Sequence, residues 1–331
     1  MKDSSPTRRH FLGTMAGAGG LALGLPAAAA DVYPNKPLRI IVPWPAAGGT
    51  DITARKLAEG LEPVLGQSII IDNRGGANGI LGTTMVAKAP PDGYTLMVST
   101  LTSHATNPTL YKSLPYDSIR DFAPVTVLQS VPMVIVVPTA SPIRTVSDIV
   151  QMAKAKPGAI SYASFGAGSM SHLAGELMKM MGGFDAIHVP YKGGGPALID
   201  TIAGHVQYYF SGVNSALPHI SGGRLRAIAV TSSGRSRPLP NVPTVAETPE
   251  FKGYEAVVPT GVWLPANTPA VIVQALHAAC LKVVRSPEYQ KALDAEGSEP
   301  IGNTPEQMLA EIRRDTDLLA KVIRQANVKV D

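Results

Sequence analysis

The sequence predicts an α/β protein built from two domains, and three observations lead to this fold class. Short β-branched apolar runs alternate with amphipathic helical segments along the chain, starting with the strand expected at 38–42. Glycine-rich turns follow strands in both halves, at 48–49 and at 166–169. Two longer apolar stretches, 125–137 and 254–264, are suited to carry the chain from one domain to the other and back.

These crossing stretches set the expected domain bounds. The chain leaves its first domain near residue 132 and returns to it near residue 255. We therefore expect domain I to comprise residues 31–131 and 255–331, and domain II to comprise residues 132–254.

The first 30 residues are predicted to be a twin-arginine signal peptide. Arg8 and Arg9 precede a Phe-Leu pair, a Gly/Ala/Leu-rich core follows, and an Ala-x-Ala cleavage site ends at Ala30. Asp31, and not a cysteine, directly follows that site, and no later apolar run reaches the roughly 20 residues that a membrane helix needs. We expect cleavage after about Ala30 and a periplasmic product, whose remaining 301 residues allow two α/β domains of ordinary size.

The charge balance argues against nucleic acid or a membrane surface as a partner. Removing residues 1–30 leaves 26 basic and 24 acidic residues, which is a nearly neutral chain. The single cysteine, Cys280, lies in an apolar helical run and cannot form an internal disulfide, so we expect it in the core.

Residues 38–62 carry the clearest functional signal. The expected strand stops at a loop with two prolines and Gly48-Gly49, and a helix follows for which Thr50 or Asp51 is a suitable N-cap. A helix N-terminus after a glycine-rich turn presents free N–H groups and positive dipole charge, which suits an anion. The turn lacks both the Walker and the dinucleotide-binding patterns. An ordinary βα turn without a ligand remains open as the alternative.

The other elements continue the same rhythm of strand and helix. Strands are expected at 68–72, 94–99, 160–164, 187–190, 206–210 and 226–230, and helices at 80–88, 146–155, 172–181, 197–203, 268–286 and 305–327. Thr145 with Asp148, and Thr304 with Gln307, are typical of capping boxes. A polar stretch at 100–104 follows a strand, at the sheet edge where open α/β folds collect ligands.

The residues indicate binding rather than catalysis. There is no Gly-x-Ser-x-Gly elbow, no His-Glu-x-x-His motif and no metal-ligand spacing among the histidines, so we expect no catalytic residue, no metal and no cofactor. A binding site requires fewer specialised residues than a catalytic site. A micromolar ligand requires about 8 kcal/mol, and hydrogen bonds to a charged group contribute roughly 1.5 to 3 kcal/mol each. The Gly/Ser/Thr turns at 47–51, 100–104 and 166–171 supply suitable donors.

The sequence also resembles a known family over essentially the whole chain after residue 30. The stretches that carry the resemblance are VPWPAAGGTD, SHATNPTLYKSLPYDSIRDFAPV, VPYKGGGPAL, NVPTVAETPEFKGYEA and the closing QANVKVD. They are similar to the substrate-binding proteins of tripartite tricarboxylate transporters, the Bug-type family. This resemblance implies a type II-like periplasmic binding protein fold, with two α/β domains joined by two crossing segments and a ligand cleft between them.

The resemblance also implies a set of ligand-binding residues. Carried over position by position, they are Ala47, Gly48, Gly49, Thr50, Asp51, Asn78, Thr100, Thr102, His104, Gly168, Ser169, His172, Tyr191 and Ser211. Two positions depart from the family's pattern. The first loop reads PAAGGTD where Pro-Pro-Gly-Gly is more usual, and Ser211 stands where the family commonly has Asp. The loss of that carboxylate favours a plain di- or tricarboxylate or an aromatic acid over an amino acid.

Taken together, these inferences predict a monomeric periplasmic solute-binding protein without enzymatic activity. It captures a small organic carboxylate by domain closure and delivers it to the membrane permease subunits of a tripartite tricarboxylate transporter. Two alternatives stay open from sequence alone. One is a cofactor-containing enzyme exported by the twin-arginine route, and the other is a sensor accessory that presents its ligand to a receptor.

Overall fold

The computed structural model describes residues 33–46 and 48–330, except for the side chains of residues 295 and 296. The predicted signal peptide, residues 1–30, and Ala47 lie outside the described residues. Residues from Pro34 onward form one compact unit.

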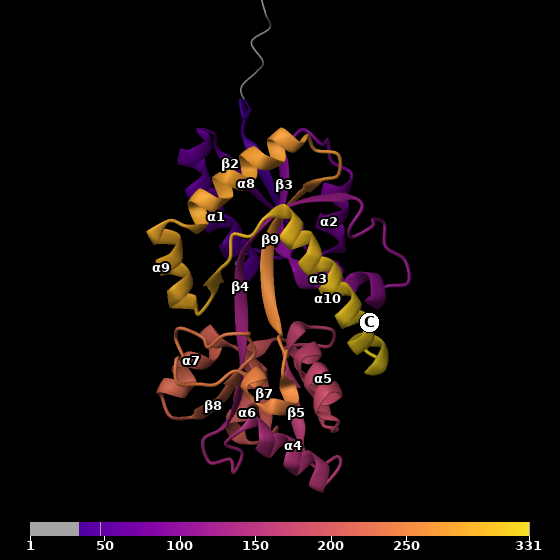
Figure 1. Ribbon diagram of the computed structural model, residues 1–331, viewed down its shortest axis with the longest axis vertical. Helices are drawn as coiled ribbons and strands as arrows, with labels where there is room; N and C mark the ends of the chain where they lie inside the picture. The colour runs from indigo at the N-terminus through magenta and orange to yellow at the C-terminus, as the bar shows by residue number, and fades with distance from the viewer. Residues whose placement is uncertain (1–32, 47, 331) are drawn as a thin grey trace, which may run out of the picture. The chain divides into compact units, whose positions relative to one another are not determined.

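The elements alternate between strand and helix for most of the chain (Figure 1). The strands are β1 (Leu38–Val42), β2 (Ile69–Asn73), β3 (Thr95–Thr100), β4 (Phe122–Pro138), β5 (Ser161–Ser164), β6 (Ile187–Pro190), β7 (Tyr208–Gly212), β8 (Leu225–Val230), β9 (Val257–Pro265) and β10 (Glu299–Pro300). The helices are α1 (Gly49–Leu65), α2 (Ile80–Ala87), α3 (Leu101–Leu110), α4 (Val146–Ala155), α5 (Met170–Gly182), α6 (Gly194–Ala203), α7 (Val213–Ser221), α8 (Ala270–Val284), α9 (Pro287–Glu296) and α10 (Pro305–Gln325), with short 3-10 turns at Val245–Glu247 and Pro249–Phe251.

The strands pair in the order β2-β1-β3-β9-β4-β7-β5-β6, with β8 and β10 attached to β4. Strand β1 is parallel to β2 and β3, and strand β5 is parallel to β6 and β7. Parallel neighbours need a crossover connection, and helices supply it in each group. The chain therefore contains two parallel βα groups, and β9 and β4 lie between them in the order of strands.

Strands β4 and β9 are the two crossing stretches that the sequence predicts, and they pair antiparallel (Figure 1). Their register runs from Phe122 opposite Pro265 to Pro132 opposite Val257. Beyond Pro132, β4 no longer pairs with β9 and pairs instead with β7 and β8. Outgoing and returning chain are thus adjacent at the point where the chain passes between the two parallel groups.

Among the predicted helices, α2, α4 and α10 begin where the sequence predicts, whereas α1, α5, α6 and α8 begin two or three residues away. Capping boxes at Thr145 and Thr304 are confirmed, because in each the threonine side chain accepts from the N3 N–H and the N3 side chain accepts from the cap. Helix α1, however, begins earlier than predicted and its N-cap is Gly48, which offers no side chain. Asp51 therefore lies inside the first turn of the helix and not at its cap.

Two features of the described chain were not anticipated. The polar stretch that follows β3 is the start of helix α3, for which Thr100 is the N-cap and accepts from the Ser103 N–H. Helices α7 and α9 were missed as well. In contrast, Cys280 is fully buried, as expected.

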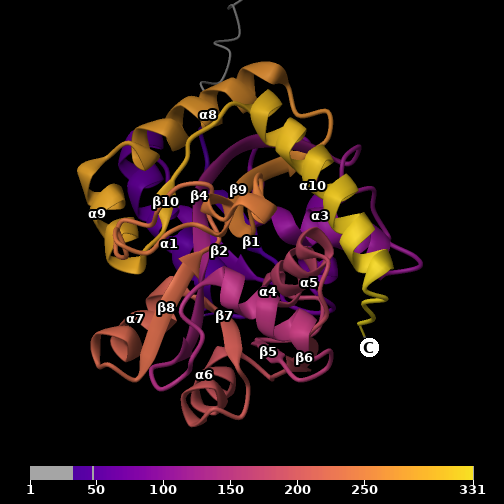
Figure 2. The same cartoon turned by 60° about the horizontal axis from the view of Figure 1, so that its bottom comes forward.

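The apolar core consists of clusters on either side of the crossing strands. One cluster packs β1, β3 and α2 with Trp263 of β9 and Met308 of α10. Another surrounds α5 and includes Leu319, Val322 and Ile323 from the end of α10. Helix α10 thus contacts α3 along its length and reaches α5 with its last turns (Figure 2). Among the described residues, no helix is both long enough and apolar enough to cross a membrane.

Candidate functional site

A cavity of about 360 Å³ opens where several strands end and helices begin. This volume lies within the range of pockets for small ligands. The lining residues are Trp44, Thr50, Asn78, Thr100, Thr102, Ser103, Thr106, Phe165, Gly168, Ser169, Met170 and Val258. They come from the first parallel group, from the β5–α5 turn and from β9, so segments far apart in the sequence meet here.

The cavity lies at the N-termini of α1, α2, α3 and α5. Thr50 is in the first turn of α1, Asn78 precedes the Gly79 cap of α2, and Ser169 is the cap of α5. Helix N-termini present free N–H groups and partial positive charge, and these favour an anion. No charged side chain is among the residues that line the cavity. The positive potential therefore comes from backbone dipoles and not from a guanidinium or ammonium group.

The polar side chains of the cavity fall into two groups. The first group is engaged within the protein: Ser169 Oγ donates to Gly166 O at 2.6 Å, and Asn78 Nδ2 donates to Asn107 Oδ1 at 2.7 Å. In the second group, the buried Trp44 Nε1 has no partner within the described part of the chain. A buried N–H without an acceptor is costly, and this one belongs to a residue that lines the cavity.

Apolar side chains form the remaining wall of the cavity. Phe165, Met170 and Val258 contribute to it, together with the ring of Trp44. The arrangement is thus amphipathic: N–H and hydroxyl groups gather at the helix N-termini, and apolar side chains complete the enclosure. Such a site can hold an anionic head group and an apolar body.

The structure brings together several of the residues that the sequence singles out. Thr50, Asn78, Thr100, Thr102, Gly168 and Ser169 all line the cavity. Gly48 and Gly49 lie next to it, at the start of α1, while Ala47 is outside the described residues. Ligand contact by these residues remains a prediction.

Two of the expected site residues have structural partners instead. Asp51 is buried, and its carboxylate accepts from Arg55 Nε and from Asn73 Nδ2, each at 3.0 Å. His104 is also buried and stacks on Trp263 with ring centroids 4.5 Å apart. Burial lowers the pKa of His104 to about 3, so the imidazole is neutral. Neither side chain lines the cavity.

Three further expected residues also lie away from the cavity. Tyr191 donates its hydroxyl to Asp200 Oδ2 at 2.7 Å, and burial together with this carboxylate raises the pKa of Tyr191 to about 12. Ser211 is fully buried in β7 and donates to Gly212 O at 3.2 Å. His172 lines a different and larger cavity, described below.

Several lining residues were missed by the sequence reasoning. Trp44 and Phe165 stand inside loops that the sequence had marked, so their position carried a signal. Ser103 lies in the polar stretch 100–104 that the sequence had marked, whereas Thr106 belongs to the part of helix α3 that was not foreseen. Met170 falls within the marked turn 166–171, whereas Val258 has no local signal, because it reaches the cavity only through the packing of β9.

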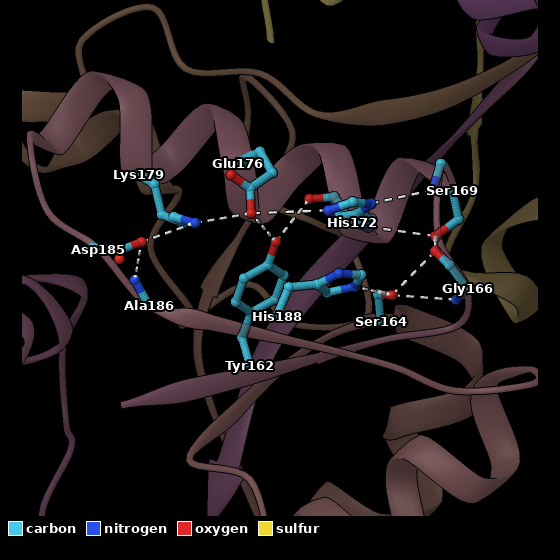
Figure 3. A network of polar contacts seen from close by, with 11 residues as sticks. Tyr162, Ser164, Gly166, Ser169, His172, Glu176, Lys179, Asp185, Ala186 and His188 are labelled. Carbon is cyan, nitrogen blue, oxygen red and sulfur yellow. Dashed lines mark hydrogen bonds and ion pairs between the residues drawn. The ribbon is translucent and has the colours of Figure 1, made fainter. Parts of the chain in front are cut away.

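A polar network lies behind the turn that ends at Ser169 (Figure 3). It joins this turn to His172, Glu176 and Lys179 on α5, and to Tyr162 and His188 on the neighbouring strands. Glu176 accepts from the Tyr162 hydroxyl at 2.6 Å and from Lys179 Nζ at 3.0 Å. No group of three or more possible metal ligands occurs among the residues that the structure describes.

Comparison with known proteins identifies the family. The model of the tripartite tricarboxylate transporter family receptor, TctC, matches residues 53–328. BugT of Bordetella pertussis is 35% identical over 91% of this chain and 92% of its own length. The solved structure of the periplasmic binding protein BugD is 33% identical, with a TM-score of 0.71, and covers 90% of this chain and 99% of that one.

A second solved structure, Rpa4515 of R. palustris with adipate, is 34% identical, with a TM-score of 0.75 and coverage of 90% and 99%. These similarities extend over nearly all of the described residues. The chain therefore belongs to the tripartite tricarboxylate transporter receptor family, the Bug-type binding proteins, and has their type II-like, two-domain periplasmic binding protein fold.

Proposed function

We propose that this protein captures a small organic carboxylate in the cavity at the N-termini of α1, α2, α3 and α5, and delivers it to the membrane permease subunits of a tripartite tricarboxylate transporter. One observation carries this proposal: the cavity combines several helix N-termini with a buried Trp44 N–H that has no hydrogen-bond partner among the described residues, and none of the described lining residues is cationic. The adipate-bound relative supports a carboxylate ligand.

The donors around the cavity are sufficient for a useful affinity. Each hydrogen bond to a carboxylate contributes roughly 1.5 to 3 kcal/mol, and micromolar binding requires about 8 kcal/mol net. Trp44 Nε1, the hydroxyls of Thr50 and Thr102 and the first N–H groups of the helices supply enough donors to exceed that value before ordering costs are subtracted. The apolar wall adds the burial of the ligand's body.

The same lining limits the class of acid. Every additional ionised carboxylate would leave water without a cationic partner, which is costly in a site of this kind. We therefore expect aromatic acids and dicarboxylates to bind more tightly than tricarboxylates. An α-ammonium group has no free carboxylate to meet, because Asp51 is already engaged and Ser211 carries none. Amino acids are accordingly expected to bind less well than their deaminated analogues.

Binding is proposed to involve closure of domain I, residues 31–131 and 255–331, on domain II, residues 132–254. In support of this, the cavity is lined both by residues of the first parallel group and by Phe165 to Met170 of the second. The protein is proposed to act as a monomer in the periplasm, after a twin-arginine signal peptide is removed at about Ala30.

A thermal-shift screen of the purified protein lacking residues 1–30 tests this proposal. The panel comprises benzoate and other aromatic acids, adipate and other dicarboxylates, citrate, and amino acids paired with their deaminated analogues. A ligand at a hundredfold excess over its Kd stabilises the folded state by about 2.7 kcal/mol, which is a clear shift. A shift confined to carboxylates, confirmed by calorimetric titration, is the expected result. If no acid shifts the protein, the carboxylate assignment is refuted.

Delivery to a transporter requires a separate experiment. Deleting the gene should abolish uptake of the radiolabelled acid that gave the largest thermal shift. Unchanged uptake combined with a lost transcriptional response to the same acid would instead assign the protein to a sensor.

A further inference from the structure

The β5–α5 turn, residues 164–169, is held from behind by two histidines that do not line the ligand cavity (Figure 3). The Gly168 N–H donates to His172 Nδ1 at 3.1 Å. Ser164 Oγ lies 2.7 Å from His188 Nε2. Each imidazole thus supports one end of the turn whose other face, at Gly168 and Ser169, lines the cavity.

The two histidines form one unit. Their rings stack with centroids 3.6 Å apart and an interplanar angle of 6°. Both rings line a second cavity of about 990 Å³, which Ala167 of the turn also lines. Because the rings are in contact, a shift in position or a change in charge of one ring affects the other ring and, through its hydrogen bond, the turn.

The hydrogen bond from Gly168 fixes the protonation state that the turn needs. Because His172 Nδ1 accepts, the neutral ring carries its proton on Nε2, which faces Glu176 Oε1 at 3.8 Å. A second proton would have to occupy Nδ1, where it would point at the Gly168 N–H. Two donors cannot share a hydrogen bond, so protonation of His172 releases this end of the turn.

We propose that His172 and His188 are positioning residues for the ligand turn, and that acidification loosens the turn and weakens ligand binding by protonating His172. The statement about ligand binding rests on the proposed function, since it requires that the turn lines the ligand site. The statement about the turn does not depend on it.

The surrounding charges do not favour the protonated pair. On α5, Glu176 is already engaged by Tyr162 of β5 and by Lys179, and Lys179 also pairs with Asp185 at 3.0 Å. Lys154 of α4 and Lys329 near the C-terminus line the same large cavity and add positive charge. The nearer carboxylate, Glu176, is therefore already engaged by the Lys179 ammonium and the Tyr162 hydroxyl before the histidines gain any charge.

Burial also disfavours protonation of the two histidines. It lowers the pKa of His172 to about 4, with a further contribution from Lys179. The pKa of His188 is also lowered to about 4, mainly by burial and then by His172. The turn is accordingly expected to stay ordered at neutral pH and to loosen only as the pH approaches 4.

The experiment follows the Gly168 amide and the His172 ring nitrogens by NMR in the ligand-free protein. In the wild type, both signals should move with one shared midpoint near pH 4. The variant His172→Asn keeps an acceptor, Oδ1, close to the position of Nδ1 and cannot titrate. Its Gly168 amide should resemble that of the neutral wild type and stay constant with pH.

The variant His172→Gln is the matched control, because its longer side chain places the amide near Nε2 and removes the acceptor from Gly168. Its Gly168 amide should resemble the acid form of the wild type at every pH. If the two variants give the same Gly168 signal, or if the wild-type amide does not titrate with His172, the positioning role is overturned. Near-UV circular dichroism at pH 7.5 verifies that each variant is folded.

The effect of acidification on ligand binding is measured with adipate, whose Kd is determined at several pH values. If half of the turn is released at pH 4, the apparent Kd of the wild type doubles there, and at pH 3.5 it rises about fourfold relative to neutral pH. The acid's own titration affects the wild type and His172→Asn equally, so the ratio of their Kd values isolates the turn. A ratio that stays constant with pH refutes the link to binding. Absence of any adipate binding bears on the proposed function alone and leaves the NMR result intact.

Discussion

Replacement of His104 by phenylalanine is expected to make the protein less sensitive to mild acid. His104 is fully buried between aromatic rings, stacked on Trp263 and edge-on to Phe122 at 4.9 Å. Its Nε2 has no hydrogen-bond partner within the described part of the chain. Nothing in this environment stabilises an imidazolium, and burial lowers the pKa to about 3 from the value of 6.5 expected in an unfolded chain.

The direction and size of the effect follow from linkage. Below pH 6.5 the unfolded chain binds a proton at His104 that the folded chain does not take up, so stability is lost as the pH falls from 6.5 towards 3. Between pH 8 and pH 5 the loss amounts to about 2 kcal/mol from this one residue. That is a substantial part of the 5 to 15 kcal/mol that stabilises an ordinary domain.

Urea unfolding of wild type and His104→Phe at pH 8 and pH 5 measures this difference. Phenylalanine preserves the stacking and removes the orphaned nitrogen, while its extra volume costs roughly 1 to 3 kcal/mol, so the two proteins should have comparable stability at pH 8. The wild type should lose about 2 kcal/mol more than the variant on going to pH 5. The other buried histidines are present in both proteins and cancel.

The control is His205→Gln, which removes an exposed imidazole at the end of α6. It is expected to change the free energy of unfolding by no more than about 0.5 kcal/mol at either pH. If His104→Phe loses as much stability as the wild type between pH 8 and pH 5, the buried neutral state of His104 is refuted.

Three further predictions concern the cavity, its turn and the core. Thr102→Val should weaken binding of the best acid from the thermal-shift screen by roughly 10- to 100-fold with little change in stability, as expected for a lost hydrogen bond to a carboxylate. Its control, Thr201→Val, loses a buried hydrogen bond to a backbone carbonyl, so it should cost about 1 kcal/mol of stability and leave the affinity unchanged. Calorimetry measures the affinity and urea unfolding the stability of each variant. Gly168→Ala and Gly158→Ala both force alanine to a φ above +70°, which costs about 1 kcal/mol of stability each. Only Gly168→Ala also places a methyl group 2.8 Å from the Val330 side chain in the C-terminal tail, so its melting temperature should fall further. Equal shifts in melting temperature would contradict the packing of the tail on the turn. Cys280 is fully buried and its pKa is raised to about 12, so iodoacetamide at pH 8 should leave the native protein unmodified and alkylate it in urea, as mass spectrometry would show.

Much of the fold could be predicted because its signals are local. The strand at Leu38–Val42, the caps at Thr145 and Thr304 and the crossing stretches depend on nearby residues, and the structure confirms them. The start of α1 was misplaced because serine, threonine and aspartate are favoured at N-caps, whereas here Gly48 takes that place without a side-chain bond.

The site was harder to predict, because its composition is decided by packing. His104 and Thr102 lie two residues apart in α3, yet one is stacked inside the core and the other lines the cavity. The turn of the helix that begins at Leu101 decides which of the two side chains faces the cavity, and the polar sequence had not indicated a helix there. Val258 reaches the cavity from β9, more than 150 residues after Thr102 in the chain, so no local pattern could have revealed it.

The pairing of Pro132 with Val257 has a consequence for protein engineering. Directly opposed residues of antiparallel strands have Cα atoms about 4.5 to 5.5 Å apart, so the intervening segment leaves and returns through almost the same point. A short linker could therefore replace this whole segment without stretching the remainder. Exchanging residues 133–256 for the corresponding segment of BugT or BugD would in this way transplant Phe165, Gly168, Ser169 and Met170 as a cassette, and their contribution to specificity could be measured apart from that of the other lining residues.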